Sequence, residues 1–98
     1  MAQFDVYRLP DGMRVVDVQS RFASVHATRL VIPLIAPDEQ AASTTRLNPL
    51  LEIDGETWIL AIQFASTLDE RLLRTPIASL ARDDLVIKGA IDFLINGF

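Results

Sequence analysis

The residue types that most often perform catalysis are scarce in this chain of 98 residues. His26 is the only histidine and cysteine is absent, which excludes a thiolate nucleophile, a zinc–thiolate site and a metal site built on paired histidines. A histidine titrates near neutrality and could act as a general base. The polar neighbours Ser24 and Thr28 instead favour an exposed loop position for His26, without a catalytic role.

Two pairs of adjacent carboxylates, Asp38-Glu39 and Asp83-Asp84, could serve acid–base chemistry or bind a hard cation. Both pairs stand next to expected element boundaries, where acids form turns and cap helices, so we assign them structural roles. The chain contains neither a phosphate-binding glycine loop nor a nucleophile elbow. The sequence therefore predicts a protein that is not an enzyme and needs no cofactor.

The charge distribution argues against a nucleic-acid surface. Five arginines balance five acids in residues 1–49, whereas four cations face eight acids in residues 50–98, giving the net charge of −4. Without a basic run, direct binding of nucleic acid is not expected. The apolar stretches 30–36 and 58–62 are too short for a bilayer span, and the first residues do not resemble a signal peptide. We expect one cytoplasmic domain over residues 1–98, not a membrane protein.

Alternating apolar residues predict five strands, at 4–9, 13–20, 29–35, 50–53 and 57–64. Pro10-Asp11-Gly12 and Asp54-Gly55 have the residue types of tight hairpin turns. Residues 38–45 suit a loop or a short helical turn, and 67–82 stays ambiguous because Pro76 interrupts any continuous helix. The order of these elements predicts a mostly β fold, a small antiparallel barrel or a strongly curved sheet.

A helix is predicted from residue 83 to the C-terminus, capped by Asp83 or Asp84 and ended by Gly97. One apolar stripe contains Ile87, Ile91, Leu94 and Phe98, and a second contains Val86, Ala90 and Phe93. A helix packed on a small sheet needs only one buried stripe. The second stripe indicates a partner, most simply another copy of the chain.

Three aromatic residues have two possible roles each. Trp58 fits a core position near a hairpin better than an exposed binding position. Phe22 suits either a contact with a partner or burial against the sheet, and Phe98 could fold back into the core or protrude towards a partner.

The segments Val16-Asp17-Val18-Gln19-Ser20 and Leu30-Val31-Ile32-Pro33-Leu34, with the gap between them, resemble the CcdB family of toxins from bacterial toxin–antitoxin modules. The opening Gln3-Phe4-x-Val6-Tyr7, the hairpin Gly55-Glu56-Thr57-Trp58 and the helix Ile87-Lys88-Gly89-Ala90-Ile91 are similar to the family in the same order. The resemblance implies a cytoplasmic homodimer with an SH3-like antiparallel barrel and a C-terminal helix. It also implies a poison that binds the A subunit of DNA gyrase and traps the cleaved-DNA complex without catalysis. A cognate antitoxin would neutralise this toxin, and in the repressor complex of the two proteins the antitoxin would carry the DNA-binding part.

The resemblance also implies two sets of site residues. The gyrase-binding set is Phe22, Ala23, Asp92, Ile95, Asn96, Gly97 and Phe98. Gyrase-poisoning members end in Trp-Gly-Ile, so Asn96 stands where they have tryptophan, and Asp92 replaces an asparagine. The antitoxin-binding set is Arg8, Arg14 and Arg46, which suit an acidic, disordered antitoxin segment.

Two alternatives accompany this interpretation. A homologue of the same fold could bind its antitoxin without poisoning gyrase, because Asn96 cannot supply the stacking of an indole. An RNA-cleaving toxin on a related barrel would need basic residues and an acid–base pair around the scissile phosphate. The isolated His26 and the absence of a basic patch disfavour it.

Overall fold

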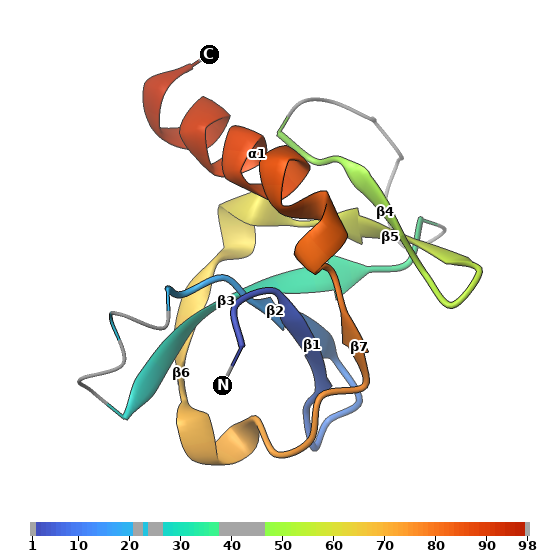
Figure 1. Cartoon of the computed structure of the whole chain (residues 1–98), viewed down its shortest axis with the longest axis vertical. Coiled ribbons are helices and arrows are strands. Elements are labelled where there is room, and N and C mark those ends of the chain that lie inside the picture. The colour runs from blue at the N-terminus through green and yellow to red at the C-terminus, as the bar shows by residue number, and fades with distance from the viewer. Residues whose placement is uncertain (1, 21–22, 24–26, 38–46, 98) are drawn as a thin grey trace.

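The computed structural model describes residues 2–20, 23, 27–37 and 47–97. Its strands form one strongly curved, barrel-like sheet in which every pairing is antiparallel, and one helix follows at the C-terminal end (Figure 1). The predicted fold class, mostly β in an antiparallel barrel with a C-terminal helix, is confirmed. The strands are β1 (Asp5–Arg8), β2 (Arg14–Asp17), β3 (Thr28–Ile35), β4 (Leu50–Ile53), β5 (Glu56–Leu60), β6 (Ser66–Asp69) and β7 (Ala78–Ser79).

The long strand β3 produces the curvature of the sheet. Along one edge, β3 pairs through Leu34 and Ile35 with β5, and through residues 28–31 with β6. The chain leaves β5 through the short 3₁₀ helix η3 (Ile62–Phe64) and returns as β6. Pro33, which has no N–H to donate, lies between the two pairings, and its carbonyl accepts from the Ala61 N–H at 3.0 Å. The other edge of β3 pairs with β2, and the sheet continues through β1 to β7.

Both faces of the sheet are covered. Val6, Val16 and Ile32 point to the main core, where Leu60 and Ile87 are also fully buried. The alternate residues Tyr7, Val15 and Val31 point to the opposite face and pack with Leu73 in a smaller cluster. Because side chains alternate along a strand, apolar residues at consecutive positions of β1 and β2 require cover on both sides. Curvature of the sheet and the segment after β6 provide that cover.

Several predicted strand boundaries were wrong. Strand β2 ends at Asp17 instead of continuing to residue 20, and β5 ends at Leu60 because η3 follows. The predicted 4–9 strand begins only at Asp5, since Phe4 has a left-handed backbone with φ of 72°. Within residues 67–82, left ambiguous above, lie most of β6, η4 (Glu70–Leu72), β7 and the start of η5 (Ala81–Asp83). The Asp54-Gly55 turn is confirmed, with both residues at positive φ between β4 and β5.

Helix α1 spans Asp84–Asn96 and ends at Gly97, as predicted. Gly97 has φ of 77°, and its N–H donates to the Phe93 carbonyl. Of the two residues predicted to cap the helix, Asp83 accepts no capping hydrogen bond through its side chain. Asp84 does accept one, from the Leu85 N–H to Oδ1 at 2.8 Å.

Candidate functional site

The C-terminal turns of α1 present a cluster of exposed residues. Asp92, Asn96 and Gly97 are all exposed, and Ile95 exposes 71% of its surface. The left-handed Gly97 ends the helix directly after them. In Figure 1, α1 leads away from β7 and its last turns project beyond the strands. The four residues therefore form one accessible surface, which we call the helix end.

The same helix carries apolar side chains that the sheet does not cover. Ile87 and Ala90 are buried, and Ile91 is partly buried against the main core. Outside this buried stripe, Leu85 is 79% exposed, and the other exposed apolar residues of the helix are Val86, Leu94 and Ile95. A shallow hollow of about 230 Å³ lies beside Gly89, between Pro49 and the first turns of α1. Surplus apolar surface is thus present on the described helix, but it does not follow the predicted stripe. Ala90 of the predicted second stripe is buried, whereas Leu94 of the predicted buried stripe is exposed.

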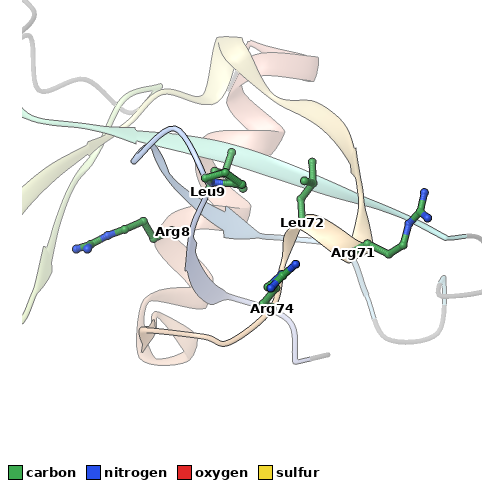
Figure 2. A pocket seen from close by; sticks show the side chains of 6 residues that line it. Arg8, Leu9, Arg71, Leu72 and Arg74 are labelled. Atoms are coloured by element: carbon green, nitrogen blue, oxygen red, sulfur yellow. The ribbon is translucent and has the colours of Figure 1, made fainter.

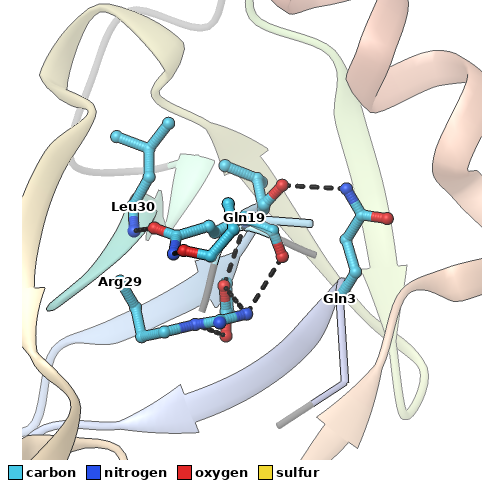
Figure 3. A network of polar contacts seen from close by, with 7 residues as sticks. Gln3, Gln19, Arg29 and Leu30 are labelled. Carbon is cyan, nitrogen blue, oxygen red and sulfur yellow. Dashed lines mark hydrogen bonds and ion pairs between the residues drawn. The ribbon is translucent and has the colours of Figure 1, made fainter. Parts of the chain in front are cut away.

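A polar network closes the segment that leaves β2 and returns as β3 (Figure 3). Arg29 donates from Nε to Asp17 Oδ2 at 2.9 Å and from Nη2 to Asp17 Oδ1 at 3.1 Å. Gln19 adds two contacts, because its Nε2 donates to the Ala23 carbonyl at 2.8 Å and its Oε1 accepts from the Leu30 N–H at 2.9 Å. The network ties the residues just after β2 to β3, and Ala23 is exposed.

Four of the predicted gyrase-binding residues, Asp92, Ile95, Asn96 and Gly97, lie together on the helix end. A fifth, Ala23, is also exposed. The other predicted positions, Phe22, Phe98 and Arg46, lie outside the described residues, as do His26 and Asp38-Glu39.

The first hairpin places two arginines side by side. Arg8 and Arg14 are direct partners in the β1–β2 register. The Arg14 guanidinium lies over the ring of the partly buried Trp58, 4.6 Å from its centroid, which is a cation–π arrangement. Trp58 therefore packs against the main core, the position that its sequence context favours, and its ring also contacts Arg14 of the same chain.

A family model described as CcdB protein matches residues 3–97. The chain belongs to the CcdB family. Members of this family are toxins of toxin–antitoxin modules, which assigns the chain to that class. A comparison with curated proteins gave no match.

One cluster of arginines in this CcdB-family chain was not predicted from the sequence. Arg8 lines a hollow together with Arg71 and Arg74, which follow β6 more than 60 residues later in the chain. Nothing in the local sequence connects these positions, because Asp69-Glu70-Arg71 reads as a solvated charge run. Only the return of the chain after β6 brings Arg71 and Arg74 near the first hairpin.

The described residues of this CcdB-family chain also show how the titratable groups are placed. Among them, no group of three or more metal-ligating side chains gathers in one place. Burial, reinforced by the nearby Asp5 and Asp17 carboxylates, raises the pKa of Tyr7, which keeps its hydroxyl protonated.

No helix in the described part of the structure has both the length and the apolar character needed to cross a membrane.

Proposed function

We propose that this CcdB-family toxin binds the A subunit of DNA gyrase through the helix end and traps the cleaved-DNA complex. The observation that carries the proposal is the exposed end of α1 in a chain of this family, with Ile95 71% exposed beside Asn96 and Gly97. An exposed apolar side chain at a helix terminus is suited to fill a pocket on a protein partner. The action requires binding alone, so no catalytic residue of the toxin takes part.

The proposed active form is a homodimer in the cytoplasm. Leu85, Val86 and Leu94 expose apolar surface along α1, which a second copy would cover. Pairing of two chains would also supply a second helix end and a second exposed Ala23. The dimer would thereby present a larger target surface than one chain.

A cognate antitoxin is the second proposed partner. Arg8 and Arg14 lie together on the first hairpin, and Arg46 belongs to the same proposed antitoxin set. An acidic antitoxin segment would complement these cations. The antitoxin, not this acidic toxin, would carry the DNA contacts of a complex that regulates transcription.

A gyrase cleavage assay tests the target. The purified chain is incubated with gyrase, supercoiled DNA and ATP, and the linear DNA released on denaturation is measured. We expect linear DNA to accumulate with the native chain and to fall at least tenfold with Ile95→Ala, because apolar anchors of an interface commonly contribute 2 kcal/mol or more. Ile77→Ala is the matched control, since Ile77 is also exposed (44%) but lies before β7, far along the chain from the helix end.

A second candidate function keeps the fold and the antitoxin but not the gyrase target. Asn96 and the charged Asp92 on the helix end favour it, because neither supplies an aromatic contact. A folded dimer, verified by light scattering, that releases no linear DNA would select this alternative.

A further inference from the structure

A hollow of about 440 Å³ lies between the C-terminal end of β1 and the segment that follows β6. Its lining consists of Arg8, Leu9, Pro10, Arg71, Leu72 and Arg74. Figure 2 shows Leu9 and Leu72 in the middle of the view, Arg74 below them, and the side chains of Arg8 and Arg71 extending to opposite sides. We call this feature the arginine hollow. It combines an apolar centre with three cationic side chains on its rim.

The cations of the arginine hollow are largely unneutralised. Arg71 forms an ion pair with Asp69, with 2.8 Å between Nη2 and Oδ2, and its side chain is 87% exposed. Within the described residues, neither Arg8 nor Arg74 has a carboxylate within ion-pair distance. Three of the nine cations of an otherwise acidic chain thus meet at one place, and two of them lack an acidic partner there.

Arg8 also faces a second hollow that limits the positive surface. Arg8 and Arg14 line it together with Asp54 and Glu56, so acids balance the arginines on that side. An anionic ligand is therefore favoured on the side of Arg74 and Arg71. The positive surface is short and bounded, unlike the extended basic tracks that hold a nucleic-acid backbone.

We infer that the arginine hollow binds an extended acidic peptide in which an apolar side chain is flanked by carboxylates. The apolar side chain would lie against Leu9, Pro10 and Leu72, and the flanking carboxylates would meet the guanidinium groups spread around them. Guanidinium groups suit this role because they bind carboxylates through paired hydrogen bonds. The inference deepens the proposed function and rests on it in one respect, since the peptide would be a segment of the antitoxin.

The structure also orders the three arginines by importance. Arg74 and Arg8 can engage a ligand without losing an existing ion pair, whereas Arg71 must share its charge with Asp69. Replacement of Arg74 or Arg8 by glutamine should therefore weaken peptide binding about tenfold, which corresponds to about 1.4 kcal/mol. Arg71→Gln should weaken it by a smaller factor, roughly threefold.

The test is a calorimetric titration of the full chain with a synthetic peptide that has leucine at its centre and two acidic residues on each side. The same peptide with every acid replaced by its amide is the ligand control. Arg82→Gln is the protein control, since Arg82 is an exposed arginine (74%) that forms an ion pair with Asp83 at 3.8 Å and does not line the arginine hollow. We expect the acidic peptide alone to bind, with Arg82→Gln within twofold of the native chain.

Three results would overturn the inference. They are no binding of the acidic peptide to the native chain, equal weakening by Arg82→Gln and Arg74→Gln, or a short DNA duplex that binds the native chain more tightly than the peptide in the same titration. The gyrase cleavage assay on the same samples separates the two proposals. Peptide binding without linear DNA would overturn only the gyrase target. Linear DNA without peptide binding would overturn only the arginine hollow, and Arg74→Gln should poison gyrase as well as the native chain does.

Discussion

Asp17 and Arg29 form an ion pair that is almost completely shielded from water, with 0% and 1% of their side chains exposed. Two hydrogen bonds join the pair, and Arg29 Nη2 also donates to the Gln19 carbonyl at 3.0 Å. The Gln19 N–H in turn donates to Asp17 Oδ1 at 3.0 Å. Buried charges are tolerated when their hydrogen bonds are satisfied in this way. The pair therefore fixes the register of β2 and β3 at the point where the segment of Ala23 leaves the sheet.

Removal of one partner of this pair should be strongly destabilising. Arg29→Met leaves the Asp17 carboxylate buried without its cation, and we expect a loss of about 3–5 kcal/mol in the free energy of unfolding. The double variant Asp17→Leu/Arg29→Met should lose much less than the sum of the single variants, because no charge is then left buried. Urea unfolding at one fixed protein concentration measures all four chains. Additive losses would contradict this account of the pair.

The sequence predicts those parts of the fold that depend on local chemistry. The Asp54-Gly55 turn and the end of α1 at Gly97 follow from residues that tolerate positive φ, and both are found. Strands β6 and β7 were missed because they are short and depend on distant partners, Thr28–Val31 for β6 and Asp5–Val6 for β7. The arginine hollow was missed for the same reason, since its two halves meet only after β6 has paired with β3.

A methyl group at position 97 should destabilise α1 through the backbone alone. Gly97 has φ of 77°, and a Cβ built there meets no other atom within 4 Å. The expected cost of Gly97→Ala is therefore the left-handed penalty, about 1–2 kcal/mol in the free energy of unfolding. Gly97→Asn should lose less, because asparagine tolerates this conformation better. Thermal unfolding of the three chains measures the difference, and equal stability of the alanine variant would contradict it.

Asp69 should titrate well below an ordinary aspartate. The hydrogen bonds that Arg71 donates from its side chain and its backbone N–H lower the pKa of Asp69 from 3.8 to about 2. Because the folded-state pKa is the lower one, the stabilisation is complete above about pH 4 and is lost as the pH falls towards 2. Carboxyl NMR shifts measure this midpoint. In Arg71→Gln the pKa of Asp69 should rise only part of the way back to 3.8, since the backbone hydrogen bond remains.

A tryptophan at position 96 should strengthen gyrase poisoning if the helix end is the target surface. Asn96 is exposed in the last turn of α1, so an indole there can reach a partner without disturbing the core. Gain of an aromatic anchor commonly contributes 2 kcal/mol or more at an interface, so about thirtyfold less of the Asn96→Trp chain should give the same amount of linear DNA. Thr75→Trp, at another exposed polar position but outside α1, is the control that should bring no gain.

Arg8 should weaken the fold while it serves the binding of an acidic partner. It lies directly opposite Arg14 in the β1–β2 register, and like charges at such positions are destabilising. Asp54 and Glu56 line the same hollow but form no ion pair with either arginine in the described part of the chain, so part of the repulsion remains. Arg8→Thr should therefore raise the free energy of unfolding by about 0.2–1 kcal/mol at low salt. The gain should nearly vanish in 1 M salt, where charges are screened within about 3 Å. Urea unfolding at both salt concentrations measures the gain, with Arg82→Thr as the control for the loss of one exposed arginine.

If Arg8→Thr is more stable and also binds the acidic peptide about tenfold more weakly, the repulsion between Arg8 and Arg14 is a cost of the binding surface. If the variant is less stable at low salt, Arg8 contributes to the fold, and its place in the hairpin has a structural explanation instead.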